Sequence, residues 1–155
     1  MINKSILIVD DEPCIRLAYS KVFTNAGYNV QAVESAEQAL EIMRATPAEV
    51  LFLDLNLPAM NGVDLCRIVH KEWPWSITIA VTGYASIFEL VSCREAGLED
   101  YYHKPVGSKE LLAAAQESFN KVERWKRRPE AHHHEARLTR PEQAGCGSSD
   151  FWPKS

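Results

Sequence analysis

Acidic side chains follow two apolar runs of the sequence, at the point where each run ends. Residues 6–9 lead directly into Asp10 and Asp11, and residues 50–53 lead directly into Asp54. If the two runs are neighbouring strands, the three carboxylates lie within a few ångströms of one another. Such close like charges raise one another's pKa unless a cation neutralises them, and ligands that are all oxygen suit a hard ion such as Mg²⁺.

A hydroxyl group and an ammonium group follow two further apolar runs. Residues 77–81 end at Thr82, and the short run 101–103 leads into Lys104. A hydroxyl donor and a cation that face metal-bound carboxylates can stabilise the equatorial oxygens of a phosphoryl group. In that arrangement Asp54 is the nucleophile and forms an acyl phosphate.

Segments of strand character alternate with segments of helical period along most of the chain, and this alternation would position those side chains. The strand candidates are residues 6–9, 29–33, 50–53, 77–81 and 101–103. The helix candidates are residues 13–26, 36–45, 62–72, 86–96 and 109–124. Repeated βα units of this size imply an α/β fold with a doubly wound parallel sheet, whose active site lies beyond the carboxyl ends of the strands.

Local signals mark the ends of several predicted helices. Ser35, with Gln38 three residues later, resembles a capping box. Pro13 suits the first turn of a helix, and Gly27 and Gly97 stand where two helices are expected to end.

Composition and charge restrict the class of protein. The chain has 155 residues, 46% of them hydrophobic and 25% charged, which fits one globular domain. No apolar run approaches the roughly 20 residues that span a bilayer, and no signal peptide is recognisable. The four cysteines form no zinc or disulfide pattern, so we expect a reducing cytoplasm. Residues 1–124 carry 11 Lys and Arg against 17 Asp and Glu, which argues against direct DNA binding by this part.

Four short motifs stand at the ends of the predicted strands. They are Val9-Asp10-Asp11-Glu12, Leu53-Asp54-Leu55-Asn56-Leu57-Pro58 followed by Gly62, Val81-Thr82-Gly83-Tyr84, and Tyr101-Tyr102-His103-Lys104-Pro105. Together and in this order they resemble the response regulator receiver domain of two-component signalling, over about residues 4–124. The resemblance implies a receiver domain at residues 1–124 with a flavodoxin-like fold: a five-stranded parallel sheet of order 2-1-3-4-5 with five helices, in three layers.

The resemblance also implies the chemistry of the acidic residues. Asp54 would accept a phosphoryl group from a histidine kinase or a phosphorelay protein. Asp11, Asp54 and the backbone carbonyl of Asn56 would bind Mg²⁺ directly, and Asp10 would act through water. Asn56 and Tyr84, two residues beyond the phosphoacceptor and the threonine, would set how long the acyl phosphate lasts.

A conformational switch is implied in the same way. Thr82 and Lys104 would hold the phosphoryl group, and movement of Thr82 toward it would free space into which Tyr101 can rotate. This would remodel the face of the fourth helix, fifth strand and fifth helix, through which a downstream protein partner would bind. The bond between Lys104 and Pro105 is expected to be cis.

Two other classes of function compete with this interpretation. Haloacid dehalogenase-like phosphatases also use a carboxylate nucleophile with Mg²⁺, but they carry a second aspartate where this chain has Asn56. A degenerate receiver that acts only as an interaction module is expected to lack Asp54, Lys104 or a member of the acidic pair, and all are present. We therefore expect no enzyme activity beyond self-dephosphorylation.

Residues 125–155 lack the helical period of the preceding part, and prolines and glycines interrupt them. This composition is typical of a mobile or partly helical tail, and no output domain is recognisable in it. We expect a single-domain bacterial regulator, similar to chemotaxis regulators, that signals through protein contacts. The segment Phe151-Trp152-Pro153 is a candidate docking element within this tail.

Overall fold

The computed structural model describes residues 4–127, in which five strands alternate with five helices. The elements are β1 (Ser5–Val9), α1 (Pro13–Asn25), β2 (Asn29–Val33), α2 (Ala36–Ala45), β3 (Val50–Leu53), α3 (Gly62–Glu72), β4 (Ile77–Thr82), α4 (Ile87–Glu95), β5 (Asp100–His103) and α5 (Ser108–Lys126). The alternation confirms the α/β class predicted from the sequence.

All strands pair in parallel, in the order β2-β1-β3-β4-β5, as the receiver resemblance implied. From β1 the chain adds β2 on one side of the sheet and then β3, β4 and β5 on the other side. β1 and β3 therefore lie side by side. Their register sets Val9, the last residue of β1, next to Leu53, the last residue of β3. The residues that follow the two strands therefore begin at the same edge of the sheet.

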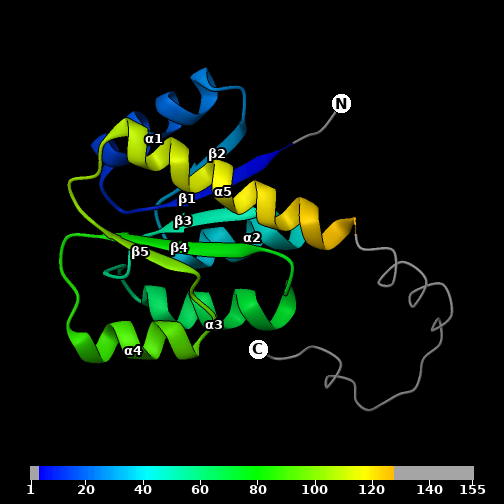
Figure 1. The fold of residues 1–155 in the computed structure, drawn as a ribbon. Coiled ribbons are helices and arrows are strands. Elements are labelled where there is room, and N and C mark those ends of the chain that lie inside the picture. The colour runs from blue at the N-terminus through cyan, green and yellow to red at the C-terminus, as the bar shows by residue number, and fades with distance from the viewer. Residues whose placement is uncertain (1–3, 128–155) are drawn as a thin grey trace, which may run out of the picture. The chain divides into compact units, whose positions relative to one another are not determined.

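Helices cover both faces of the sheet, with α1 and α5 on one face and α2, α3 and α4 on the other (Figure 1). Successive strand residues point to opposite faces. Ile8 of β1 packs in an apolar cluster with Phe23 of α1 and Phe119 of α5. The next residue, Val9, packs in a second cluster with Met43 of α2. Because both faces are covered, a central strand needs apolar residues at every position, and each fully buried one contributes about 1.5–3 kcal/mol.

The elements differ from the sequence prediction mainly at their ends. Thr82 is the last residue of β4 and not the residue after it, and β5 begins one residue early, at Asp100. Helix α4 begins at Ile87 because Ser86 is its N-cap, in a capping box with Glu89. The long helix α5 runs past the predicted end, to Lys126.

The capping box predicted at Ser35 is only half formed. The Ser35 side chain accepts a hydrogen bond from the backbone N–H of Gln38, as predicted. The Gln38 side chain, however, accepts from the backbone N–H of Glu34 and not from that of Ser35. The Ser35 side chain still caps the helix, and the Gln38 side chain holds the backbone of Glu34, one residue before the N-cap.

Packing divides the chain into two units, residues 1–122 and 123–155, and the candidate site belongs to the first. The tail segment Phe151-Trp152-Pro153 and most of the predicted tail lie outside the described residues. No helix within residues 4–127 is both long and apolar enough to cross a membrane.

Candidate functional site

Three carboxylates meet at the edge of the sheet where β1 and β3 end. Oxygens of Asp10, Asp11 and Asp54 all lie within 4.8 Å of one another. Backbone hydrogen bonds that continue past the strands fix this position, since the Asp54 N–H donates to the Val9 carbonyl over 2.9 Å and the Asp10 N–H donates to the Val33 carbonyl over 3.1 Å. Asp10 and Asp54 are buried, whereas Asp11 is exposed to solvent. The prediction that these acids converge is thus met in the structure.

Lys104 brings its ammonium group into the same cluster. Its Nζ lies 2.9 Å from Asp10 Oδ2, 3.2 Å from Asp54 Oδ2 and 3.7 Å from Glu12 Oε1. The side chain is only 13% exposed, so these ion pairs are largely removed from solvent. Lys104 directly follows β5, and its backbone N–H donates to the Thr82 carbonyl at the end of β4 over 2.9 Å. The peptide bond between Lys104 and Pro105 is cis.

Burial and charge act in opposite directions on these groups. Burial raises the pKa of Asp10, although the hydrogen bonds from Lys104 and from the Glu12 N–H oppose this rise. Burial lowers the pKa of Lys104, but the hydrogen bond and charge of Asp10, together with Asp54, outweigh it and leave the pKa raised. Lys104 is therefore held in its charged form by the carboxylates around it.

Asn56 connects the phosphoacceptor candidate to Thr82. The backbone N–H of Asn56 donates to Asp54 Oδ1 over 3.1 Å, and its side-chain Nδ2 donates to Thr82 Oγ1 over 3.1 Å. Thr82 is fully buried at the end of β4. Direct contacts at one edge of the sheet thus link Asp10, Lys104, Asp54, Asn56 and Thr82, and Asp11 lies beside them.

The tyrosines of the Thr82 and Lys104 motifs have different surroundings. Tyr101, the predicted switch residue, is half-buried and packs on the apolar cluster of α2, α3 and α4. Tyr102 packs on the opposite cluster, with α1 and α5. Tyr84 is 70% exposed, and it lies between Thr82 and the start of α4. Of the two strand tyrosines, Tyr101 therefore shares a face of the sheet with α4.

Sequence reasoning missed several residues that shape the site. Arg16, in the second turn of α1, donates from Nη1 to the Asp10 carbonyl over 2.8 Å. Glu12, assigned no role from the sequence, lies near Lys104. A basic residue six positions after Asp10 is a weak signal, because whether its side chain reaches the Asp10 carbonyl depends on the path of the chain from β1 into α1. The side-chain contacts of Asn56 left no signal in the sequence.

Gly62, the first residue of α3, allows the loop after β3 to close tightly. A Cβ atom at this position would lie 2.5 Å from the Asp54 carbonyl oxygen and 2.6 Å from the Leu55 Cα. The Gly62 N–H donates to the Leu55 carbonyl over 3.1 Å. The absence of a side chain therefore lets α3 start directly against the backbone of the candidate phosphoacceptor.

The oxygen atoms of the acidic cluster fit a magnesium ion. Mg²⁺ prefers hard oxygen ligands and is usually bound by one or two carboxylates together with water. Asp11 is exposed and so offers room for such waters, while Asp10 and Asp54 supply buried carboxylates beside it. Nothing in this set of donors favours a soft metal such as zinc bound by thiolates.

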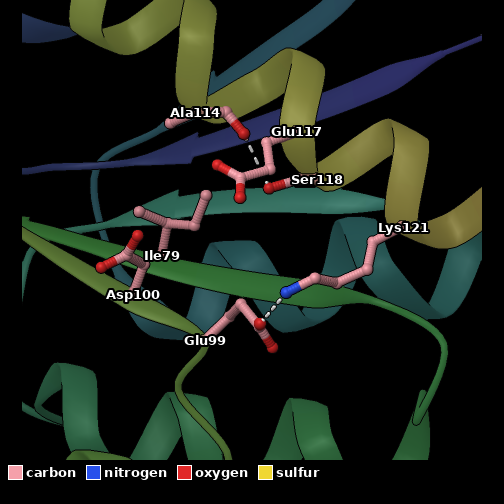
Figure 2. Close-up of a pocket in the computed structure, with 7 residues that line it drawn as sticks. All are labelled: Ile79, Glu99, Asp100, Ala114, Glu117, Ser118 and Lys121. Atoms are coloured by element: carbon pink, nitrogen blue, oxygen red, sulfur yellow. Dashed lines mark hydrogen bonds and ion pairs between the residues drawn. The ribbon is translucent and has the colours of Figure 1, made fainter.

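A small pocket at the other end of β5 is separate from this site (Figure 2). Its lining residues are Ile79, Glu99, Asp100, Ala114, Glu117, Ser118 and Lys121. In Figure 2, Lys121 pairs with Glu99, and the Ser118 hydroxyl donates to the Ala114 carbonyl. The Lys121–Glu99 pair ties α5 to the residue before β5, whereas the Ser118 hydrogen bond lies within α5. None of the lining residues belongs to the acidic cluster.

Comparison with protein families gives one match that covers most of the described chain. Residues 6–116 match the model of the response regulator receiver domain. Among solved structures, the chain is similar to a response regulator receiver domain protein (CheY-like) from Methanospirillum hungatei JF-1. The TM-score is 0.78 at 32% identity, over 79% of this chain and 98% of that one.

Curated relatives include transcriptional regulators that are longer than this chain. The DNA-binding response regulator MtrA of Mycolicibacterium smegmatis is 31% identical over 121 residues, which are 78% of this chain and 53% of MtrA. The TorCAD operon transcriptional regulatory protein TorR of Escherichia coli O157:H7 is 36% identical over 107 residues, which are 69% of this chain and 46% of TorR. The chain thus spans about half the length of these two relatives.

Replacement of Gly62 by alanine tests how the loop after β3 is held. The added methyl group would overlap the backbone of Asp54 and Leu55, and overpacking of this kind typically costs about 1–3 kcal/mol. We expect Gly62→Ala to lower the free energy of unfolding by that amount in urea denaturation. The matched control is Gly107→Ala, where a Cβ atom would have no neighbour within 4 Å. Equal stability of the two variants would contradict the close approach.

Proposed function

Because the chain belongs to the response regulator receiver domain family, we propose that it signals by accepting a phosphoryl group on Asp54 from a histidine kinase or a phosphorelay protein. The observation that supports this most is the meeting of Lys104 with Asp10 and Asp54 beside Asp11. The carboxylates form a cluster that suits a divalent ion, and the ammonium group of Lys104 lies beside them, where it suits a phosphoryl oxygen. The carboxylate of Asp54 is the nucleophile in this proposal, and the product is an acyl phosphate.

The surroundings of Asp54 suit phosphoryl transfer. One carboxylate oxygen accepts the Asn56 backbone N–H, and the other lies next to Lys104 Nζ, so the group is held in one orientation. Lys104 is positioned to stabilise negative charge on the phosphoryl oxygens. Asp10, Asp11, Asp54 and the backbone carbonyl of Asn56 would hold Mg²⁺. When bound, the ion would neutralise charge on the carboxylates and on the phosphoryl group.

Thr82 and Tyr101 are the proposed switch. Thr82 would donate its hydroxyl to a phosphoryl oxygen, and this contact exists only in the phosphorylated state. A contact made in one state alone shifts the balance between two packings. Tyr101, half-buried on the α4 side of β5, would move into the space that Thr82 leaves, and a downstream protein would bind the face of α4, β5 and α5.

Further parts of the function stay predictions. The receiver domain is not expected to turn over outside substrates, and loss of phosphate from Asp54 would be its only catalytic step. A cytoplasmic location is predicted from the spacing of the cysteines, and the absence of direct DNA binding is predicted from the acidic charge of residues 1–124. Two relatives carry names that include DNA binding or transcription, but the match covers only about half of each.

Incubation with acetyl phosphate is the direct test of the phosphoacceptor. With Mg²⁺, intact mass spectrometry should show an adduct of about 80 Da, the mass of one phosphoryl group, on Asp54. Asp54→Asn and chelation of Mg²⁺ should each remove it, whereas Asp64→Asn, on exposed Asp64 of α3, should keep it. Continuous release of phosphate without an adduct would indicate a phosphatase, and no modification at all would indicate an interaction module.

Thermal unfolding tests the metal site without phosphate. A ligand that binds only the folded state at about ten times its Kd stabilises it by about 1.4 kcal/mol. For a domain of this size the melting temperature should rise by about 3–5 °C when Mg²⁺ is added. Asp11→Asn should remove most of this rise, and Asp64→Asn should not. A melting temperature that Mg²⁺ leaves unchanged in the unmodified protein would contradict the site.

Replacement of Tyr84 tests what limits the lifetime of the acyl phosphate. If the ring shields the phosphoryl group from in-line attack by water, Tyr84→Ala should lose phosphate faster, by about threefold or more. The measurement is the decay of the adduct on Asp54 after acetyl phosphate is removed. The variant keeps the Tyr84 backbone carbonyl, so the result reports on the ring alone. An unchanged decay rate would refute shielding.

A further inference from the structure

The Asn56 side chain makes two hydrogen bonds that tie the loop after β3 to the end of β4. Its Nδ2 donates to Thr82 Oγ1 over 3.1 Å and to the Tyr84 carbonyl oxygen over 3.0 Å. A side-chain amide nitrogen carries two hydrogens, so both are used. The Thr82 hydroxyl in turn donates to the same Tyr84 carbonyl over 3.4 Å. The Asn56 amide, the Thr82 hydroxyl and the Tyr84 carbonyl are thus each hydrogen-bonded to the other two.

This set of hydrogen bonds directs the Thr82 hydroxyl away from Asp54. A hydroxyl has one hydrogen to donate, and here it goes to the Tyr84 carbonyl. The amide of Asn56 occupies an acceptor position on the same oxygen. Thr82 cannot donate to a phosphoryl group on Asp54 until it releases the Tyr84 carbonyl, so the observed arrangement and the phosphate-bound one exclude each other.

The same set restrains the segment that leads into α4. Residues 83–86 connect Thr82 to the helix, and a side chain at Gly83 would meet nothing within 4 Å. Along this segment the Tyr84 carbonyl is held by Asn56, and Ser86 is held by its capping box with Glu89. The first turn of α4 then presents Ile87 and Phe88, both largely exposed. Asn56 therefore connects the loop of the phosphoacceptor to the helix whose face is proposed to bind a partner.

We propose that the Asn56 side-chain amide is a latch that holds Thr82 and the Tyr84 carbonyl together in the unphosphorylated state and opposes the switch. The inference rests on the proposed function, because it concerns how Thr82 is released when Asp54 is modified. Asn56 is a positioning residue here and acts through Thr82. This role depends on its two N–H donors, whereas a shielding role in hydrolysis would depend on the size of its side chain.

Binding of beryllofluoride, a stable mimic of the phosphoryl group, measures the latch. Asn56→Leu keeps a similar volume but removes both donors, so it destabilises only the unmodified arrangement. At Mg²⁺ concentrations shown to saturate each variant, it should bind beryllofluoride about three- to tenfold more tightly than the unmodified protein, measured by ¹⁹F NMR. A residue with a merely structural role would weaken binding when lost. The matched control is Asn120→Leu on exposed Asn120 of α5, which should leave the affinity unchanged.

Amide hydrogen exchange gives a second readout that needs neither metal nor phosphate mimic. Asn56→Leu and Asn56→Asp both lack the side-chain N–H donors, and both should speed exchange in residues 83–86 about threefold or more while leaving β3 unchanged. Faster exchange in only one variant, or equal or weaker beryllofluoride binding by Asn56→Leu, would overturn the latch. If the unmodified protein itself fails to bind beryllofluoride, the proposed function falls together with the inference. If it binds normally and Asn56→Leu changes nothing, only the latch falls.

Discussion

The closeness of three carboxylates to one ammonium group is the interaction on which the site depends. Lys104 reaches Asp10 and Asp54 at hydrogen-bond distance, while Asp11 stands beside them at the surface. Three carboxylates therefore surround one ammonium group at this edge of the sheet, and Glu12 adds a fourth carboxylate 3.7 Å from Lys104 Nζ. Buried charges are costly unless they are paired. A divalent cation would neutralise the excess of carboxylates, and a phosphoryl group would pair with the ammonium group of Lys104.

The sheet produces this arrangement through its order and direction. Parallel strands end at one edge, and the change of direction in the strand order sets β1 beside β3, so Asp10 and Asp54 leave adjacent strands. Lys104 arrives from β5, and its backbone bonds to the carbonyl of Thr82 on β4. The apolar clusters on the two faces hold the strands in register. The charged edge is therefore stabilised by packing that contains no charge.

Much of this could be predicted from the sequence because the signals are local. The run 50–53 and the helix 36–45 were predicted to the residue, since an apolar run ends abruptly at Asp54 and Ser35 caps the helix. Helix α5 was predicted one residue too short at its start and two too short at its end, because no glycine or proline stops it directly after Arg124. The bonds of Asn56 to Thr82 and of Arg16 to the Asp10 carbonyl were not predictable. These two hydrogen bonds depend on the positions of segments that follow the strands, and the spacing of residues in the sequence does not predict those positions.

A crystal structure of the protein with Mg²⁺ and beryllofluoride tests the central claim most directly. The expected result is beryllofluoride bonded to an Asp54 carboxylate oxygen and Mg²⁺ held by the carboxylates of Asp11 and Asp54. Lys104 Nζ should then lie within hydrogen-bond distance of a fluorine atom, closer to it than to Asp10. Beryllofluoride bound elsewhere, or an acidic cluster whose only partner is still Lys104 under saturating Mg²⁺, would contradict phosphoryl acceptance at this edge of the sheet.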